Sequence, residues 1–386
     1  MRYTTLGKTG YQVSALGFGL MRLPDNQGGM RRDLPADPVK TRELVAKAFE
    51  LGINYFDTAY PYHQQTSETV LGMALEDLGI RKDCVIATKL PSATMKEPER
   101  WESIFAEQLR KLRTDHVDVY LVHNLNRVRW ADFCRNGGLD FLTRIKRQGR
   151  ARAIGFSLHD ETDVFCTVLD GYDWDVCQIQ FNYLDIKLQA GLAGYEYAAA
   201  KGIPVISMET LKGGMLACPP PAAVQAVWDD PSLPRRSPAE WAMRWVLDHA
   251  GIAVALSGMG CDSELIANAA CAEHAPGSLS KQELTAIDKA RQIYQSMYRI
   301  QCTGCAYCMP CPQGVTIPYL FRLYNNYKLF NETHWAKIQY GQALVNGMAF
   351  PSCVGCGQCA RQCPQGLAIP ELLRDIHEEL RQLLPS

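Results

Sequence analysis

Eight of the chain's fifteen cysteines lie in two short runs near its C-terminal end. The runs are Cys302-x2-Cys305-x2-Cys308-x2-Cys311-Pro312 and Cys353-x2-Cys356-x2-Cys359-x3-Cys363-Pro364. Thiolates at this spacing hold 4Fe–4S clusters, so two runs in tandem predict a protein with two 4Fe–4S clusters. Zinc is the main alternative, because paired Cys-x2-Cys hooks also build zinc sites. Each run has four ligands of its own and a closing Cys-Pro, which favours iron–sulfur.

A second set of reactive side chains recurs at nearly constant intervals earlier in the chain. Asp57, Lys89, His123 and Ser157 follow one another at intervals of 32, 34 and 34 residues, each about one strand–helix unit. Each of them ends an apolar run, and Tyr62 lies on the loop that follows Asp57. Equal phase at successive strand ends brings side chains together on one rim, which is where barrel enzymes place their chemistry.

This constellation suits the reduction of a carbonyl group. A tyrosine hydroxyl has an ordinary pKa near 10, which is too high for easy proton exchange at neutral pH. A neighbouring ammonium lowers that pKa; Lys89 supplies the charge and Asp57 orients Lys89. Tyr62 is then the general acid for reduction and the base for the reverse oxidation, while His123 donates a hydrogen bond to the substrate oxygen. Tyr60 is the alternative proton donor, and each residue taken singly also fits a structural role.

The elements that must position these residues alternate between apolar runs and amphipathic stretches over about the first 275 residues. Eight buried strands are predicted at 16–19, 53–57, 84–89, 117–123, 151–157, 176–181, 203–208 and 252–257. Helical patterns between them include 39–51, 67–78, 98–112 and 239–247. The alternation predicts an α/β fold, a (β/α)8 TIM barrel. A doubly wound sheet is the alternative, but the first strand–helix turn lacks its G-x-G-x-x-G fingerprint.

A smaller module follows the predicted barrel. Ser280-x-x-Glu283 is a capping box that predicts a helix through about Tyr298. Further helical patterns follow at 318–329, 333–345 and 370–384. We therefore expect a barrel at 1–275, a connecting helix at 276–300, and a mainly helical ferredoxin-like domain with two 4Fe–4S clusters at 301–386.

Composition excludes several classes of function. The net charge of -1, without a Lys/Arg run, gives no basis for binding nucleic acid or an anionic membrane. The sequence has neither an apolar signal core nor an apolar run of about 18 residues, so we predict a cytoplasmic protein without a membrane span. We expect the seven cysteines outside the two runs to be mostly buried apolar residues, not disulfides.

Several segments of the chain resemble the aldo-keto reductase superfamily. The similar segments are Tyr3-Thr4-Thr5-Leu6-Gly7-Lys8-Thr9-Gly10, Leu16-Gly17-Phe18-Gly19, Asp57-Thr58-Ala59-x-x-Tyr62, Ser67-Glu68-x-x-Leu71-Gly72, Ala87-Thr88-Lys89 and Leu121-Val122-His123. The resemblance covers residues 1–275, and the cysteine runs narrow it to the subgroup fused to a C-terminal 4Fe–4S dicluster domain. It implies a catalytic tetrad of Asp57, Tyr62, Lys89 and His123, acting on a small carbonyl or alcohol substrate.

The resemblance also implies a nicotinamide nucleotide bound in extended form across the rim. The implied contacts are Gly19 and Met21 at the nicotinamide ribose, Ser157 and Gln178 at the carboxamide, Leu211, Lys212 and Gly214 at the pyrophosphate, and Gly258, Met259 and Asn268 at the adenosine end. One carboxamide contact lacks its usual residue, because Ser157 is followed by Leu158 and not by the asparagine common in the family.

The loop at 258–264 bears on the choice of nucleotide. Relatives that prefer NADP(H) place Lys or Arg there to pair with the 2′-phosphate, whereas this loop has no base and contains Asp262 and Glu264. We therefore favour NAD(H) over NADP(H), or a weakened nucleotide site. The alternative is a base that arrives from elsewhere, such as Arg22 or Lys212.

In two-cluster ferredoxins the fourth cysteine of each run ligates the other cluster. Applied here, the two ligand sets are Cys302, Cys305, Cys308 and Cys363, and Cys353, Cys356, Cys359 and Cys311.

The clusters raise a question of stoichiometry, because nicotinamide moves two electrons together and a 4Fe–4S cluster moves one. A flavin would convert between them, but the sequence has no clear flavin motif. Three interpretations stay open: electron exchange with ferredoxin or another carrier, purely structural clusters, or docking of a redox partner. The alternative to an enzyme is a non-catalytic redox sensor or electron-transfer scaffold.

The loop after the fourth predicted strand carries the residues that could bear on the substrate. Trp130 and several arginines lie there and are candidates for shaping the substrate pocket. Arg127 and Arg129 are candidates for binding an acidic substrate, although solvated surface arginines are the favoured interpretation.

Overall fold

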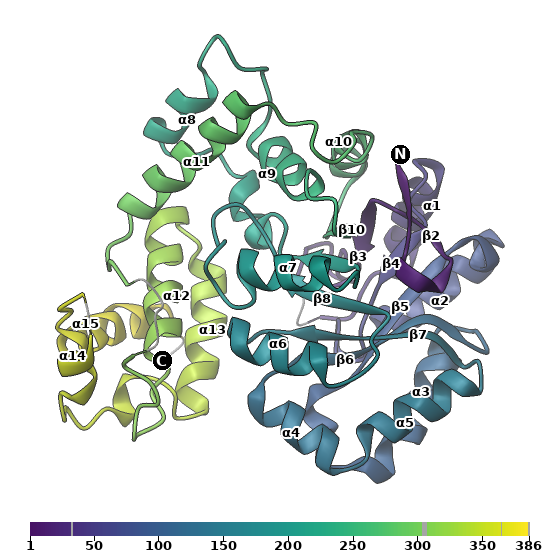
Figure 1. Cartoon of the computed structure of the whole chain (residues 1–386), viewed down its shortest axis with the longest axis horizontal. Helices are drawn as coiled ribbons and strands as arrows, with labels where there is room; N and C mark the ends of the chain where they lie inside the picture. Colours follow the sequence, from purple (N-terminus) through teal and green to yellow (C-terminus); the bar gives the residue numbers. More distant parts are fainter. Residues whose placement is uncertain (32–33, 303–306, 364, 385–386) are drawn as a thin grey trace. The chain divides into compact units, whose positions relative to one another are not determined.

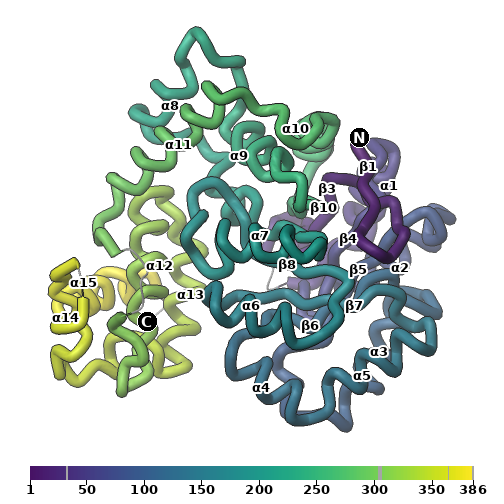
Figure 2. The backbone as a smooth tube through the Cα atoms, viewed as in Figure 1, coloured from purple at the N-terminus to yellow at the C-terminus, as the bar shows by residue number. Residues whose placement is uncertain are grey.

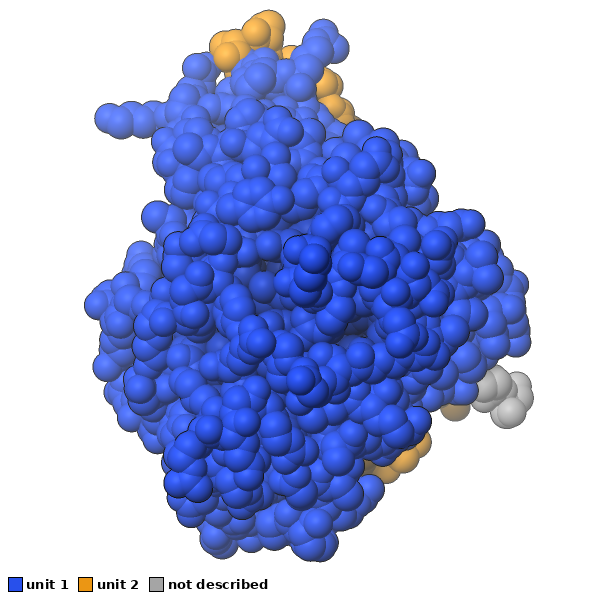
Figure 3. Space-filling model, turned by 90° about the vertical axis from the view of Figure 1, so that its right-hand side faces the viewer, with its two compact units in different colours: residues 1–217, 233–285 blue, residues 218–232, 286–386 orange. Residues whose placement is uncertain are grey.

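The chain divides into two compact units in this computed structural model (Figure 3). The structure describes residues 1–31, 34–302, 307–363 and 365–384. The first unit comprises Met1–Ala217 and Leu233–Thr285, and the second comprises Cys218–Ser232 and Ala286–Ser386.

Eight parallel strands close into a barrel in the first unit (Figure 1). Around the barrel the order is β10-β3-β4-β5-β6-β7-β8-β9. The strands are β3 (Leu16–Gly19), β4 (Tyr55–Asp57), β5 (Val85–Leu90), β6 (Val117–Leu125), β7 (Ala151–Leu158), β8 (Val176–Gln180), β9 (Val205–Met208) and β10 (Ile252–Ser257). Each predicted strand overlaps one of these, and the predicted (β/α)8 fold is confirmed. Because the strands are parallel, their carboxyl ends share one rim.

Helices surround the strands of the barrel (Figure 2). They are α1 (Pro38–Glu50), α2 (Ser67–Leu78), α3 (Trp101–Lys111), α4 (Arg127–Arg135), α5 (Gly138–Arg147), α6 (Thr162–Asp170), α7 (Gly191–Ala200), α9 (Pro238–Leu247) and α10 (Asp262–Cys271). Their starts follow local chemistry. The Asp37 carboxylate caps α1 by accepting from two backbone amides, and Pro38 occupies the first turn, where its missing N–H is not needed.

An N-terminal hairpin closes the end of the barrel opposite the rim. It consists of the antiparallel strands β1 (Tyr3–Thr5) and β2 (Gln12–Ser14). Its Leu6 and Val13 are fully buried in the apolar core formed by inward-facing strand residues. Gly17 allows the strands to approach closely here, because a β-carbon at this position would lie 2.6 Å from Val254 Cγ1. The rim is therefore left as the face on which polar groups gather.

The described residues of the second unit form helices and loops, without a strand. Its helices are α8 (Ala222–Trp228), α12 (Ile317–Phe330), α13 (Thr333–Val345), α14 (Gln358–Gln362), α15 (Ile369–Leu380) and most of α11 (Lys281–Ser296). The predicted capping box opens α11: the Ser280 amide donates to Glu283 Oε2 at 2.7 Å, and the Glu283 amide donates to Ser280 Oγ. Buried residues of α12, α13 and α15 form one apolar core, against which the described cysteines of both runs pack, apart from Cys356.

The insertion at Cys218–Ser232 departs from the predicted grouping. It lies within the range 1–275 predicted for the barrel, yet it belongs to the second unit together with α12, α13 and α15. Its helix α8 buries Val224, Val227 and Trp228. The predicted domain boundaries stay a prediction.

Among the helices that the structure describes, none has both the length and the apolar character needed to cross a lipid bilayer.

Candidate active site and cluster cavity

Three of the four predicted catalytic side chains meet at the carboxyl ends of β4 and β5. Lys89 is 1% exposed, and its ammonium donates to Asp57 Oδ1 at 2.6 Å and to the Thr58 carbonyl at 2.7 Å. The same nitrogen lies 3.5 Å from the Tyr62 hydroxyl. The three N–H groups of the ammonium thus have three oxygens within reach, which fixes the charge beside the phenol.

Tyr60, the alternative proton donor, points elsewhere. Its hydroxyl donates to Glu107 Oε2 at 3.0 Å, and the Lys111 ammonium lies 4.2 Å from its ring centre. Both partners belong to α3. The geometry therefore places Tyr62, and not Tyr60, beside Lys89.

An unusual turn holds Tyr62 in position. The three residues that follow it, 63–65, have φ values of 51°, 52° and 67° although none is glycine. Left-handed backbone costs such residues about 1 kcal/mol each, so other contacts must hold the turn. The buried His63 ring provides two of them: its Nε2 accepts from the Leu23 amide and its Nδ1 donates to the Leu34 carbonyl, both at 3.1 Å.

His123 lies beside Tyr62 at the end of β6. The two ring centres are 5.9 Å apart and the planes are nearly perpendicular. Burial lowers the pKa of His123 well below its ordinary value, and the charges of Lys89, His159 and Arg129 lower it further. The imidazole is therefore neutral at physiological pH. A neutral ring donates from only one nitrogen, so His123 can give a substrate oxygen one hydrogen bond.

The pKa of Tyr62 differs from the sequence-based expectation. Burial raises it above its ordinary value of 10.0, and the charge of Lys89 only partly opposes that rise. The prediction that the pKa of Tyr62 is lowered is therefore wrong, although the charge of Lys89 does act to lower it, as predicted. For Lys89 itself, burial is the largest single influence and lowers the pKa, but Asp57 and Tyr62 together outweigh burial and the net pKa is raised. A neutral phenol beside a permanent ammonium is poised as a proton donor.

These pKa directions predict opposite pH profiles for the two reaction directions. Reduction needs the neutral phenol, so kcat/KM for reduction should stay level from pH 6 to 9 and fall only near or above the raised pKa of Tyr62. Oxidation needs the phenolate, so its kcat/KM should rise about tenfold per pH unit over the same range. Because His123 is already neutral, neither profile should break near pH 6.5. A reductive rate that halves between pH 7 and 8 would contradict this assignment.

The two predicted carboxamide residues lie next to the tetrad. Ser157 Oγ accepts a 2.7 Å hydrogen bond from the Asn124 amide and keeps its own proton for another acceptor. Gln178 Nε2 donates to Asp57 Oδ2 at 2.9 Å. Asp57 is therefore held on one oxygen by Lys89 and on the other by Gln178, a link that the sequence did not indicate.

The predicted pyrophosphate segment contains a buried ion pair. The Lys212 ammonium donates to both carboxylate oxygens of Asp185, at 2.8 and 2.6 Å, and Gln180 also donates to that carboxylate. Leu211 precedes Lys212, and Gly214, two residues after Lys212, has a φ of 96°. Asp185 was not predicted, and its position in the loop after β8, close to the rim, is the only signal that could have indicated it.

The remaining predicted nucleotide residues lie at the ends of β3 and β10. Gly19 ends β3, and Met21 follows it with its side chain exposed. Met259 is fully buried. Asn268 on α10 donates to Ser257 Oγ at 3.2 Å, which places it beside Gly258.

The loop after β10 is followed by a carboxylate, and a base from another part of the chain lies near it. Glu264 Oε2 accepts from the Gly260 amide at 2.7 Å, so the carboxylate sits directly over the loop. The Arg22 side chain crosses this loop, because its Cβ lies 3.0 Å from where a β-carbon of Gly258 would stand. Its guanidinium reaches toward Gly213, where the Glu209 carboxylate also lies.

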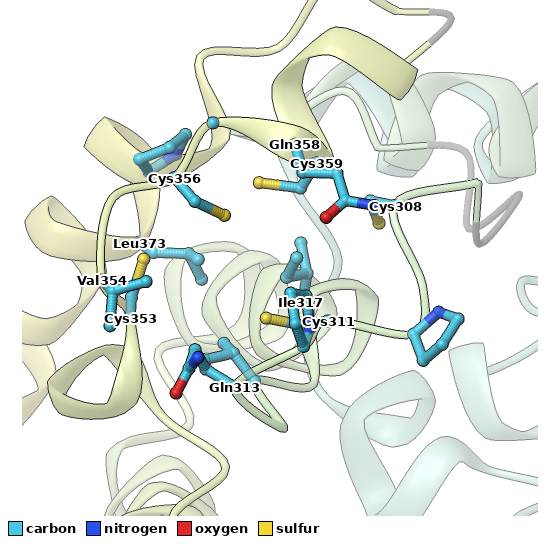
Figure 4. Close-up of a pocket in the computed structure, with 15 residues that line it drawn as sticks. Cys308, Cys311, Gln313, Ile317, Cys353, Val354, Cys356, Gln358, Cys359 and Leu373 are labelled. Carbon is cyan, nitrogen blue, oxygen red and sulfur yellow. The ribbon is translucent and has the colours of Figure 1, made fainter.

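A cavity in the second unit gathers cysteines of both runs (Figure 4). Figure 4 shows the sulfurs of Cys311, Cys353, Cys356 and Cys359 around a common space, with Cys308 at its edge. After burial, the charges of Cys353 and Cys311 are among the causes that raise the pKa of the Cys359 thiol, as expected for neighbouring thiols. The cavity thus joins the predicted fourth ligand of one run to three ligands of the other.

The cavity suits a 4Fe–4S cluster in its donors and its walls. Four thiols surround it, and the apolar side chains of Val315, Ile317 and Leu373 line it. The Gly355 amide donates to Cys353 Sγ at 3.4 Å, the type of contact that tunes cluster potentials. The other predicted set is less complete: Cys302, Cys308 and Cys363 are described, and Cys305 lies outside the described residues.

The cysteines outside the two runs follow the predicted pattern only in part. Cys84, Cys177 and Cys271 are buried, whereas Cys218 and Cys261 are exposed. The described residues contain no disulfide.

Family comparisons match both halves of the chain. A model described as the aldo/keto reductase family matches residues 15–219, more than half of the chain, and a 4Fe-4S dicluster domain model matches residues 301–368.

Two curated relatives were matched along part of their length. L-galactose dehydrogenase of Arabidopsis thaliana is 33% identical over 219 residues, which cover 55% of this chain and 66% of the relative. Aldo-keto reductase YhdN of Bacillus subtilis is 26% identical over 166 residues, covering 41% of this chain and 47% of the relative. The matches therefore span less than two thirds of either relative.

Two solved structures share the barrel fold. The holo form of aldo-keto reductase AKR11C1 from Bacillus halodurans superposes with a TM-score of 0.61 at 24% identity, over 75% of this chain and 96% of that chain. An aldo-keto reductase from Klebsiella pneumoniae in complex with NADPH gives a TM-score of 0.59 at 19% identity, over 75% of this chain and 95% of that chain.

Proposed function

Because the chain belongs to the aldo/keto reductase family and carries a 4Fe-4S dicluster domain, we propose that it interconverts a carbonyl compound and an alcohol with a nicotinamide nucleotide. The observation that carries this proposal is the arrangement of Asp57, Lys89 and Tyr62, which places a buried ammonium within 3.5 Å of a phenol. Metal-free proton donation to a carbonyl oxygen is the chemistry to which this arrangement is suited.

The side chains divide the reaction between them. The reduced nicotinamide, when bound, supplies the hydride that the carbonyl carbon accepts. Tyr62 gives its phenolic proton to the carbonyl oxygen, and the ammonium of Lys89 stabilises the phenolate that remains. His123 donates a hydrogen bond to the same oxygen, and Asp57 orients Lys89. In the oxidative direction Tyr62 takes the proton back.

Ser157 and Gln178 are proposed to hold the carboxamide of the nicotinamide. This role fits the hydrogen-bonding capacity that each side chain has left. The Ser157 hydroxyl accepts from Asn124 and still has a proton to donate. The Gln178 amide nitrogen is directed at Asp57, which leaves the amide oxygen as an acceptor for the carboxamide N–H. Lys212 stays tied to Asp185, so the backbone of Leu211 and Gly214 is the proposed pyrophosphate contact.

We expect NADH to be preferred over NADPH by about tenfold in kcat/KM, a difference of ~1.4 kcal/mol. The Glu264 carboxylate over the Gly260 amide would repel a 2′-phosphate, and Glu264→Gln should narrow the preference. Arg22 is the nearby base, so Arg22→Gln should lower turnover with NADPH more than with NADH. Steady-state kinetics with both nucleotides decide the matter. Equal or better turnover of wild-type protein with NADPH would overturn the preference for NAD(H).

The dicluster domain is proposed to hold two 4Fe–4S clusters that exchange electrons with ferredoxin or a similar small carrier. Such clusters, when assembled, move one electron at a time. The exposure of Cys356 and of Val354, a residue that is 67% exposed, supports access for a carrier to the cavity in Figure 4. Anaerobic mixing with reduced ferredoxin tests this, because bleaching of the cluster absorbance is the expected result.

A non-catalytic redox sensor is the alternative function. It would bind nucleotide and exchange electrons with a carrier, yet reduce no carbonyl compound. Absence of turnover with every aldehyde and ketone tried, in protein that binds NADH and has full iron content, would favour it.

A further inference from the structure

Arg129 lies close to the carbonyl-binding end of the proposed site. It occupies the first turn of α4, where its amide donates to Asn126 Oδ1. Its guanidinium donates to the Asn124 carbonyl at 2.8 Å. Asn124 directly follows His123, and its amide donates to Ser157 Oγ at 2.7 Å. The cation is therefore tethered to the backbone residue next to the imidazole that faces the substrate oxygen.

Arg127 and Trp130 were also candidates for contact with the substrate, but their side chains have other partners. Arg127 is exposed and forms an ion pair with Asp163 at 2.5 Å, as a surface arginine does. Trp130 packs outward, with its ring 6.1 Å from the ring of Trp174 and in contact range of Gly171. Neither side chain is directed at the rim. The favoured interpretation of both arginines as solvated surface groups therefore holds for Arg127 and not for Arg129.

The guanidinium of Arg129 is half-buried without a carboxylate to balance it. Among the described residues it forms no ion pair, and its one side-chain hydrogen bond leaves four of five N–H donors uncommitted. Burial is the cause that lowers the pKa of Arg129, and no carboxylate raises it. A partly desolvated cation without a counter-charge is costly unless an anion binds there.

The charges around His123 point the same way. Lys89, His159 and Arg129 all act on this imidazole, and no carboxylate is among the groups that shift its pKa. The two carboxylates that act on Tyr62 have other neighbours. Asp57 is bonded to Lys89 and Gln178, and Glu209, which acts on Tyr62, is adjacent to Arg22 at Gly213. The charged groups that act on His123 are therefore all positive.

We infer that Arg129 binds an oxyanion of the substrate, so that the carbonyl compounds taken by this site carry a carboxylate or a phosphate group. The inference rests on the proposed carbonyl reduction and names its substrate class. Guanidinium suits either oxyanion, because its planar N–H pairs match two oxygens at once. With the anion on Arg129, the carbonyl group at the other end of a short substrate can lie between His123 and Tyr62.

Matched pairs of charged and neutral substrates test this inference. 4-Formylbenzoate is compared with its methyl ester for the carboxylate, and glyceraldehyde 3-phosphate with glyceraldehyde for the phosphate. In wild-type protein, at least one charged aldehyde should have a higher kcat/KM than its neutral counterpart. The pair in which this difference is found shows whether the site prefers a carboxylate or a phosphate. Arg129→Met should lower kcat/KM for that substrate by about 10- to 100-fold, the factor that a charged hydrogen bond is worth. The neutral member should change little.

Control variants separate binding from a general loss of structure. Arg129→Lys should recover part of the charged-substrate rate, since it keeps the charge and loses the planar fork. Arg127→Met removes an equal charge from the same helix turn and should leave both members of each pair unchanged. Equal losses for charged and neutral substrates in Arg129→Met, or an unchanged preference, would overturn the inference.

A binding measurement keeps this test distinct from that of the proposed function. Terephthalate carries the oxyanion but has no carbonyl group to reduce, and its binding is measured by calorimetry. Wild-type protein should bind it 10- to 100-fold more tightly than Arg129→Met does. If no aldehyde is reduced yet terephthalate binding depends on Arg129, the carbonyl chemistry fails and the anion site stands. If the aldehydes are reduced and terephthalate binds both proteins alike, the anion site fails and the proposed chemistry stands.

Discussion

Tyr62→Phe is expected to lower the rate of carbonyl reduction by about 10²- to 10⁴-fold, the contribution of a positioned general acid. The substitution removes one oxygen, the one that lies 3.5 Å from the Lys89 ammonium. Phenylalanine keeps the ring beside His123, so the packing of the rim should change little. Nucleotide affinity and the absorbance of the iron–sulfur clusters should therefore stay at wild-type levels.

Tyr60→Phe is the matched control for this variant. It removes the same hydroxyl two residues away, but from a side chain bonded to Glu107 on α3. Its turnover should stay within about threefold of wild type, because an exposed or half-exposed hydrogen bond contributes only ~0.5–1.5 kcal/mol to stability and none to proton transfer here. Wild-type turnover in Tyr62→Phe, or loss of turnover in Tyr60→Phe alone, would remove Tyr62 from its role.

Cys311→Ala is expected to remove the cluster held in the cavity of Figure 4. In that cavity Cys311 stands opposite three cysteines of the second run, Cys353, Cys356 and Cys359. Without its fourth thiolate the cluster should be lost, and iron should fall from about eight to about four atoms per chain or fewer. Because the ligand sets cross between the runs, we also expect damage to the second cluster. Iron and sulfide analysis of anaerobically purified protein measures both effects.

Cys218→Ala is the control for the cluster experiment. Cys218 is an exposed cysteine of the same unit but lies outside both runs. Its replacement should leave iron, sulfide and the electron paramagnetic resonance signals of the reduced clusters unchanged. Full iron content in Cys311→Ala would show that the crossed ligand assignment is wrong, whatever the state of the control.

The sequence predicted the parts of this molecule that depend on periodicity. Asp57, Lys89 and His123 recur at one strand–helix interval, and a parallel barrel necessarily brings equal phases to one rim. The helices α12 and α13 were also predicted within one residue of their observed ends.

Other features could not be predicted, because they depend on the paths of loops. Gln178 bonds to Asp57 across 121 residues of sequence, and Lys212 pairs with Asp185 across 27. The number of residues between such partners follows no rule, because it depends on the length and path of the loops that carry them. The turn after Tyr62 is a further example, since three consecutive left-handed residues without glycine leave no mark in the sequence.

The direction of the Tyr62 pKa shift was mispredicted for a related reason. From the sequence, Lys89 was the one visible influence and it lowers the pKa. The extent of burial appears only in the folded barrel, and there it outweighs the ammonium. The outward packing of Trp130 likewise follows from a contact with Trp174 that no local pattern encodes.

Isotope transfer tests the central claim, direct hydride transfer at the barrel rim, most directly. Anaerobically purified protein is mixed in a single turnover with a carbonyl substrate and NADH that carries deuterium on either face of C4 of its ring. Our account predicts that the alcohol product acquires one deuterium on the former carbonyl carbon from one face only, and that Tyr62→Phe prevents this. An alcohol formed without deuterium from either face, or no alcohol from protein with full iron and bound NADH, would contradict it.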